Sequence, residues 1–187
     1  MNNILLVSHC ILNTASKVVL YDKKEIEAEE DLRRKFVGEA LRKGVQFIQL
    51  PCPEFTLYGS RRWGHVSTQF DNPFFRDHCS KQLDPVILQL KEYVAHKDRF
   101  HVIGILGIDG SPSCGVDRTC FGQWGGSFGE RTDLKETLDS VKCAAGSGVL
   151  IDVLKKRLET EGLTREVPVV GLFAAEPEKC MALLENL

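Results

Sequence analysis

An unbroken apolar run at residues 101–108 (HVIGILGI) most constrains what this chain can fold into. Such a run, rich in β-branched side chains and bounded by turn-forming residues, is typical of a strand that is buried on both faces. It ends at Asp109 and continues through Gly110 into a loop of small residues that carries the thiol of Cys114. A strand buried on both faces needs helices on both sides of its sheet, so the run indicates an α/β layer architecture.

Three further apolar runs, at residues 4–8, 45–50 and 167–173, have the same character. Amphipathic helical patterns at residues 25–43 and 148–161 separate them. Strands that alternate with helices predict parallel pairing, because each parallel connection needs a crossover. We therefore expect a three-layer, flavodoxin-like, doubly wound parallel sheet of about four strands, with helices on both faces. If the strand order is 2-1-3-4, as in flavodoxin-like folds, the first three strands are neighbours.

The remaining segments predict shorter elements and two long loops. A short helix is expected at residues 73–78, and Asp84 before Pro85 is a typical helix start that predicts a second helix. Residues 53–72 and 115–133 are expected to form long, irregular active-site loops, since loops of this length are usually functional. Residues 132–145 are expected to be partly helical.

The whole chain, residues 1–187, is expected to be a single α/β domain. Its hydrophobic share of 43% and charged share of 27% are typical of a soluble globular protein. A net charge of −2 gives no indication of a nucleic-acid partner. No apolar run approaches the roughly 20 residues of a membrane span, and the first residues resemble no signal peptide. These features predict a cytoplasmic protein without a membrane partner.

One cysteine follows each of the first three predicted strands: Cys10, Cys52 and Cys114. The chain has seven cysteines, an odd number, and no Cys-x-x-Cys motif, which argues against a disulfide scaffold, a zinc ribbon and a thioredoxin-type site. Adjacent strands lie about 4.8 Å apart, so thiols at their carboxyl ends are expected to converge. Three thiolates suit an iron–sulfur cluster with one open iron, or a zinc ion with one open position.

The other four cysteines carry weaker signals. Cys79, Cys143 and Cys180 lie within or beside segments with helical patterns, where a cysteine usually packs as a small apolar side chain. Cys120 lies in the second long loop, and its interpretation stays open between a fourth ligand, a sulfur carrier and a packing residue.

Three sequence blocks resemble the signature blocks of the thiouracil desulfidase family, in that family's order and spacing: ILLVSHCIL at 4–12, CPE at 52–54 and SPSCG at 111–115. The resemblance implies a flavodoxin-like fold and a [4Fe-4S] cluster held by Cys10, Cys52 and Cys114. It also implies that the iron without a protein ligand takes the sulfur of a thiolated pyrimidine.

The same resemblance implies that Glu54 is a catalytic acid/base and that Ser111 and Ser113 are active-site hydroxyls. A carboxylate near the cluster suits proton transfer to or from water, and hydroxyls suit a developing anion. The chain departs from the family pattern at Ser16, where relatives often carry a second cysteine, and at residues 55–62. These departures fall where substrate would be recognised.

A basic and aromatic cluster in the first long loop is a candidate substrate-binding element: Arg61, Arg62, Trp63 and His65. An arginine can bind a phosphate or a base carbonyl, and a tryptophan can stack on a base. His9, beside Cys10, is expected to support the site from outside rather than to replace a cysteine as ligand.

The sequence leaves three functions to compare. The first is a desulfidase that releases sulfide from a thiouracil-like nucleobase or a related small thioamide. The second is a non-catalytic iron–sulfur or zinc protein that acts as a sensor or sulfur carrier. The third is a hydrolase with Cys114 as nucleophile and His65 or His101 as base, which leaves Cys10 and Cys52 without a role.

Overall fold

The structure is a computed structural model that describes residues 1–185 and 187. Its main sheet has four parallel strands in the order β2-β1-β3-β6. They are β1 (Asn2–Val7), β2 (Gln46–Gln49), β3 (Phe100–Ile108) and β6 (Val169–Leu172). Because β6 is the fourth strand of this sheet in sequence, the order is the 2-1-3-4 order of flavodoxin-like folds, and the predicted three-layer α/β fold is confirmed.

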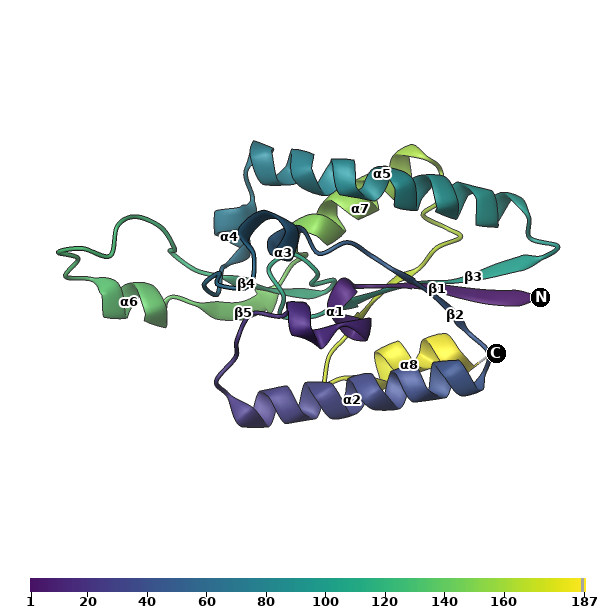
Figure 1. Ribbon diagram of the computed structural model, residues 1–187, viewed down its shortest axis with the longest axis horizontal. Helices are drawn as coiled ribbons and strands as arrows, with labels where there is room; N and C mark the ends of the chain where they lie inside the picture. The colour runs from purple at the N-terminus through teal and green to yellow at the C-terminus, as the bar shows by residue number, and fades with distance from the viewer. Residues whose placement is uncertain (186) are drawn as a thin grey trace.

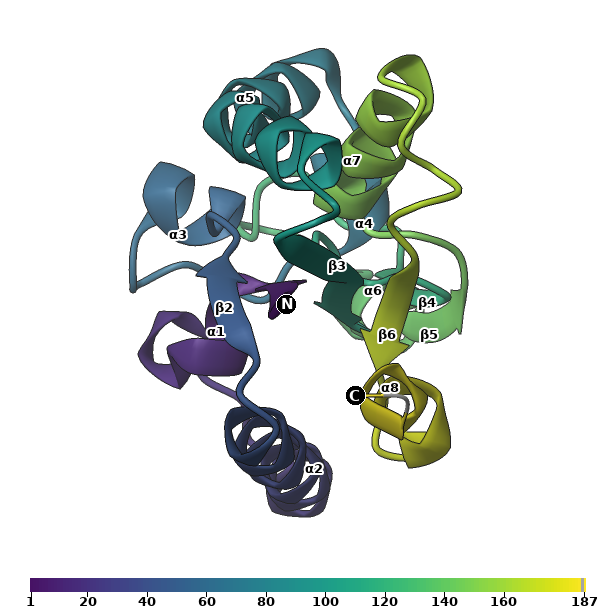
Figure 2. The same cartoon turned by 90° about the vertical axis from the view of Figure 1, so that its right-hand side faces the viewer.

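Helices cover both faces of the sheet (Figures 1 and 2). One face packs against α5 (Pro73–Ala95) and α7 (Val149–Thr160), and the other against α2 (Lys23–Arg42) and α8 (Pro177–Glu185). Side chains alternate along a strand, so Ile4 and Leu6 of β1 join the first core and their neighbours Leu5 and Val7 join the second. This double burial explains why the strands have continuous apolar sequences.

The prediction of two separate helices between β2 and β3 is wrong, because α5 runs without interruption from Pro73 through Pro85 to Ala95. The helix begins at Asn72, whose side chain accepts hydrogen bonds from the backbone of Phe74 and Phe75. A proline inside a helix removes one backbone hydrogen bond. Burial of the apolar face compensates for this loss on both sides of the proline: Cys79, Leu83, Val86, Ile87 and Leu90.

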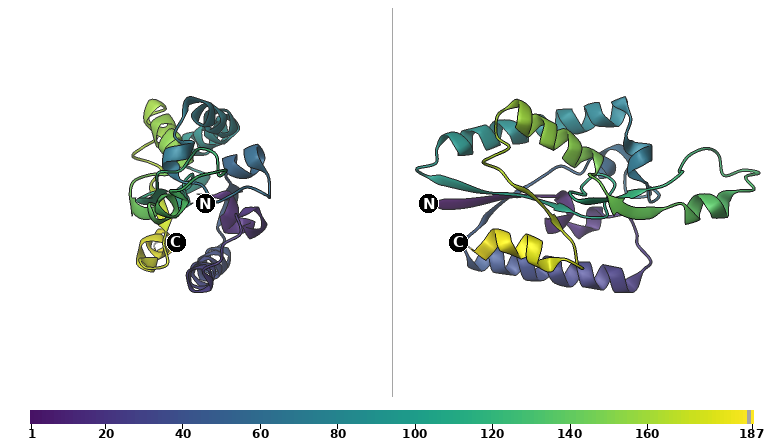
Figure 3. Two further views of the ribbon diagram at one scale, coloured as in Figure 1. Left: turned by 90° about the vertical axis from the view of Figure 1, so that its left-hand side faces the viewer. Right: turned by 180° about the vertical axis from the view of Figure 1, so that it is seen from behind.

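A second, two-stranded antiparallel sheet lies beyond the carboxyl ends of the main strands (Figure 3). It consists of β4 (Arg118–Phe121) and β5 (Lys142–Ala145), with α6 (Leu134–Asp139) between them. The helical expectation for residues 132–145 therefore holds only for α6, and its last part is a strand. The segment from β4 to β5 is called the flap below.

Short helices follow the strands that carry the predicted site. These are α1 (His9–Leu12), a 3₁₀ turn (Thr14–Ser16), α3 (Pro53–Tyr58) and α4 (Ser67–Phe70). The segment 53–72, predicted to be irregular, thus contains two helices. Two of them, α1 and α3, begin within four residues of the end of the preceding strand, which gives Cys10 and Cys52 a fixed backbone.

Both chain ends lie at the amino-terminal edge of the main sheet, at the right of Figure 1, and the flap lies at the opposite edge. The four strands are parallel, so all their carboxyl ends point toward the flap. Among the described helices, none combines the length and the apolar character needed to cross a membrane.

Candidate functional site

The three thiols predicted to converge all lie at the carboxyl edge of the sheet. Cys10 is in α1 directly after β1, Cys52 is the N-cap of α3 after β2, and Cys114 lies in the loop after β3. Burial raises the pKa of Cys10 to about 11, and raises the pKa values of Cys52 and Cys114. Negative charge on Cys52 raises the pKa of Cys10 further, and charge on Cys10 and Cys52 raises that of Cys114. The three sulfurs therefore share one electrostatic environment.

Groups that favour the thiolate form surround these sulfurs. The Lys17 ammonium lowers the pKa of Cys10, and the backbone N–H of Phe55, which donates to the Cys52 sulfur at 3.4 Å, lowers that of Cys52. The buried Ser8 hydroxyl lies beside the Cys114 thiol, and as a hydrogen-bond donor to that sulfur it lowers the pKa of Cys114. Nothing in the sequence pattern singles out Lys17, which reaches the site from the turn after α1.

The loop that carries Cys114 is held by the carboxylate of Asp109. Its Oδ1 accepts hydrogen bonds from the backbone N–H groups of Val116 at 2.7 Å, Asp117 at 3.0 Å and Arg118 at 3.3 Å. Asp109 is 8% exposed, so these bonds satisfy a buried charge. The loop therefore has one defined conformation at the strand end.

The two serines of this loop have different environments. Ser111 Oγ accepts hydrogen bonds from the backbone N–H groups of Ser113 at 3.3 Å and Cys114 at 3.0 Å, which makes it part of the loop structure. The hydroxyl of Ser113, a residue only 1% exposed, instead donates to Glu54 Oε1. Ser113 is thus the serine that contacts the predicted acid/base.

Glu54 is bound on its other side by Arg62. The Arg62 Nε donates to Glu54 Oε2 at 3.3 Å, and the two side chains are only 3% and 12% exposed. The other guanidinium nitrogens donate to the carbonyl oxygens of Gly59 at 3.1 Å and Ser16 at 2.6 Å. Arg62 therefore positions Glu54 and joins α3 to the turn after α1, whereas the neighbouring Arg61 is exposed.

A cavity of about 150 Å³ lies between the first long loop and the flap. It is lined by Trp63 and His65 on one side and, on the other, by Trp124, Phe128 and Arg131. The Trp63 and Phe128 rings lie 6.1 Å apart. Two of the four predicted substrate-binding residues therefore line a common aromatic cavity.

His65 packs against both Tyr58 and Phe70, with ring centroids 5.2 Å and 4.7 Å away, and those two rings also lie 5.8 Å from each other. Burial lowers its pKa, and the Glu54 carboxylate acts in the opposite direction, which shows that Glu54 lies within electrostatic range. The buried Nδ1 atom of His65 has no hydrogen-bond partner among the described residues. The aromatic cavity and the Glu54 site are thus neighbours.

The remaining cysteines fall into two groups. Cys79 and Cys180 are fully buried in helices, as predicted for packing residues. Cys143 is exposed in β5 and pairs with Cys120 of β4, so its expected helical position is wrong. The Cys120 thiol donates to the backbone carbonyl of His65 at 3.3 Å.

The two histidines His9 and His101 have separate roles. His9 Nδ1 lies 3.3 Å from the carbonyl oxygen of Leu50, and His9 Nε2 lies 3.4 Å from Asn13 Nδ2, so the ring fixes the chain beside Cys10. His101 lies at the start of β3, roughly 23 Å of strand away from the loop that carries Cys114. His101 therefore does not reach the Cys114 thiol, and the hydrolase interpretation loses one of its two bases.

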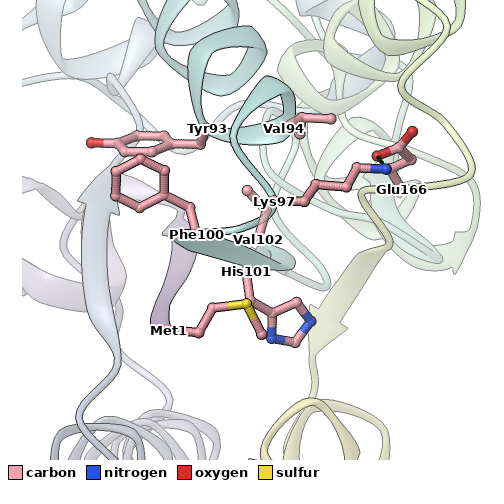
Figure 4. Close-up of a pocket in the computed structure, with 8 residues that line it drawn as sticks. All are labelled: Met1, Tyr93, Val94, Lys97, Phe100, His101, Val102 and Glu166. Atoms are coloured by element: carbon pink, nitrogen blue, oxygen red, sulfur yellow. Dashed lines mark ion pairs between the residues drawn. The ribbon is translucent and has the colours of Figure 1, made fainter.

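A larger cavity, about 370 Å³, lies at the amino-terminal edge of the sheet, away from the thiols (Figure 4). The Lys97–Glu166 ion pair, 2.5 Å long, closes one side of it. It is lined by Met1, Tyr93, Val94, Lys97, Phe100, His101, Val102 and Glu166. Ligands of open α/β sheets bind at the carboxyl ends of the strands, so size alone does not make this cavity the functional site.

Comparison with known proteins gives one relative. No family model and no solved structure matches the chain. The uncharacterized protein MJ0003 of Methanocaldococcus jannaschii is 35% identical over 113 residues, which span 60% of this chain and 67% of that protein. This chain belongs to the same protein family as MJ0003.

Proposed function

We propose that this protein is an iron–sulfur-dependent desulfidase, which removes sulfur as sulfide from a thiouracil-like nucleobase or a related small thioamide. The observation that carries the proposal is the gathering of Cys10, Cys52 and Cys114 from three separate strand ends, next to a buried Glu54–Ser113 pair. Three thiols alone suit any metal centre, but a sensor or storage site has no need of a buried carboxylate and hydroxyl.

The donor set fits a [4Fe-4S] cluster. Cysteine thiolates are the ligands of such clusters, and Lys17 and Arg62 lower the pKa values of Cys10 and Cys52, which favours the bound form. Among the described residues, no three His, Cys, Asp or Glu side chains lie close enough to share a single metal ion.

The net reaction is hydrolysis: a thione and water give a carbonyl compound and hydrogen sulfide. When bound, the cluster would supply a soft Lewis acid for the substrate sulfur. Glu54 takes a proton from the attacking water and returns a proton to the product. Ser113 donates to the carboxylate and keeps it oriented, and Arg62 balances its charge in a place where an unpaired carboxylate would be costly.

The aromatic cavity beside Glu54 is the proposed place for the substrate ring. Trp63 and Trp124 offer planar surfaces for stacking, and His65 lines the same cavity. Arg61, exposed at the same loop, is available to a phosphate or carbonyl of a larger substrate.

Anaerobic purification tests the proposal. The protein is expected to be brown, with about four iron and four sulfide per chain, and to release sulfide from 2- or 4-thiouracil. Cys114→Ala is expected to lose the iron, whereas Glu54→Ala is expected to keep it and to lose about 10²–10⁴ in the rate of sulfide release.

Two other results would each support one of the alternative functions instead. A brown protein that releases no sulfide from any thiolated base supports the sensor or sulfur-carrier function. A colourless, metal-free protein with hydrolase activity supports a cysteine nucleophile, although the raised pKa of Cys114 disfavours that chemistry.

A further inference from the structure

Cys120 and Cys143 lie directly opposite each other in the ribbon formed by β4 and β5. Directly opposite residues in an antiparallel ribbon have their side chains on the same face. Their neighbours in the register are Thr119 opposite Ala144 and Phe121 opposite Lys142. The ribbon thus places two thiols side by side outside the set of three that the proposed cluster uses.

The hydrogen bonds of the ribbon show which kind of pair this is. The N–H of Gly146 donates to the carbonyl oxygen of Asp117 at 2.9 Å, so these two residues form a hydrogen-bonded pair. Hydrogen-bonded and non-hydrogen-bonded pairs alternate along an antiparallel ladder. Three steps further, Cys120 and Cys143 form a non-hydrogen-bonded pair. The Cys120 carbonyl confirms this, because it points away from β5 and accepts from Ser67 Oγ at 2.8 Å.

A non-hydrogen-bonded pair brings two Cα atoms to about 4.5 Å, closer than a hydrogen-bonded pair. That separation falls within the range of about 4.4–6.8 Å that a disulfide bond spans. At that ideal separation, rotation of the two side chains is enough to join the sulfurs. Both thiols are free in this structure.

The two thiols differ in access. Cys143 is exposed, so a reagent in solution reaches it directly. Cys120 is half-buried, and its thiol donates to the backbone carbonyl of His65. Accessible thiols react first in disulfide exchange, and a neighbouring thiol then resolves the mixed disulfide. The pair therefore has one entry point and one resolving group.

We infer that Cys120 and Cys143 form a dithiol oxidation site, which closes to an intramolecular disulfide by exchange with a low-molecular-weight disulfide such as oxidised glutathione. The Cys143 thiolate attacks the glutathione disulfide and releases one reduced glutathione. Cys120, after losing its proton to water, attacks the Cys143 sulfur and releases the second. Two electrons pass from the two thiols to one glutathione disulfide, and the two protons end on the released thiols.

Closure of this disulfide would join the two ends of the flap and replace the hydrogen bond from Cys120 to His65. The segment between the two cysteines carries Trp124, Phe128 and Arg131, which line the aromatic cavity. Oxidation is therefore expected to change the wall of that cavity. The inference does not depend on the proposed desulfidase activity.

The experiment uses the full chain, purified under reducing conditions and then incubated anaerobically with oxidised glutathione. Proteolytic digestion and mass spectrometry should find the peptides of Cys120 and Cys143 joined, with the loss of two hydrogens. Two reduced glutathione molecules should appear for each bond. Disulfide bonds that involve Cys10, Cys52 or Cys114, the proposed cluster ligands, are identified separately from the peptides that contain these residues.

The matched control moves one thiol by a single residue. The double variant Cys143→Ala/Ala144→Cys keeps the number of thiols but puts the second one on the other face of the ribbon. It should give a stable mixed disulfide with glutathione and no internal bond to Cys120. Glutathione that stays on Cys143 in the wild-type protein, or equal internal bonding in the double variant, would overturn the inference.

Discussion

Glu54 accepts a hydrogen bond from the hydroxyl of Ser113, which joins the start of α3 to the loop after β3. The two residues are far apart in sequence and follow different strands of the sheet. Each lies close to one of the proposed cluster cysteines, since Glu54 is two residues after Cys52 and Ser113 directly precedes Cys114. The bond therefore links the proposed acid/base to the backbone that carries Cys114.

The coupling of Glu54 and Ser113 gives the first prediction. Ser113→Ala removes the donor to Glu54 Oε1, and we expect a smaller loss of sulfide release than for Glu54→Gln, which we expect to cost about 10²–10⁴. The double variant should be no slower than Glu54→Gln, because residues that act as one unit are not additive. Steady-state sulfide assays at matched iron content measure this. Additive losses would show that the two side chains act independently.

A second prediction concerns the buried ion pair. Arg62→Gln leaves the Glu54 carboxylate unpaired in a buried place and should lower the free energy of unfolding by about 3–5 kcal/mol. Arg61→Gln is the matched control, because the adjacent arginine is exposed and its loss should change stability by less than about 0.5 kcal/mol. Urea unfolding of both variants compares them. Equal stabilities would mean that the pair does not hold α3.

A third prediction tests the close packing of α7 on the Cys114 loop. A Cβ atom at Gly148 would lie 2.8 Å from the Cys114 nitrogen and closer still to the Ser113 carbonyl group. Gly148→Ala should therefore displace the loop and cost about 1–3 kcal/mol, with a loss of iron content. Gly38→Ala in α2 is the control, since a Cβ there meets nothing within 4 Å. It should stabilise the protein by about 0.5–1 kcal/mol in thermal unfolding.

A fourth prediction concerns acid stability. Hydrogen bonds from Arg33 lower the pKa of Glu30 from 4.5 to about 2, and Arg33 also binds the carbonyl of Ile11 at 2.7 Å, next to Cys10. Because the folded-state pKa is lowered, this stabilisation is complete above pH 4.5 and is lost as the pH falls toward 2.

Glu30→Gln should therefore lower the free energy of unfolding by about 1–2 kcal/mol at pH 7. The difference from wild type should shrink as the pH falls below about 4.5. The control is Glu39→Gln, whose partner Arg42 is exposed, so its effect should stay within about 0.5 kcal/mol. A difference between wild type and Glu30→Gln that is constant with pH would contradict the assignment to this carboxylate.

The parallel sheet was predictable because its central strands, β1 and β3, are apolar on both faces, a pattern with few alternative explanations. The strand β5 was not predictable, because its four residues (KCAA) are short and largely exposed and pair with a distant segment. The single helix α5 was missed because Asp84 and Pro85 give a strong local signal for the start of a new helix. Buried contacts on both sides of the proline override that signal and keep the helix continuous.

The candidate site shows the same limit. The positions of Cys10, Cys52 and Cys114 follow from topology alone, since each is close to the end of a parallel strand. The direction of a long side chain does not follow from topology. Arg61 and Arg62 looked equivalent in sequence, yet one is exposed and the other is buried against Glu54. Lys17 was missed because a lysine in a turn gives no signal of the thiol that it approaches.

The placement of both chain ends at the edge opposite the thiols has a practical consequence. An affinity tag or a fusion partner at either end would extend from the edge opposite the loops that carry Cys10, Cys52 and Cys114, where we propose that the cluster and the substrate bind. Such a handle allows the protein to be captured on a resin inside an anaerobic chamber, loaded with iron and sulfide, and assayed without being released.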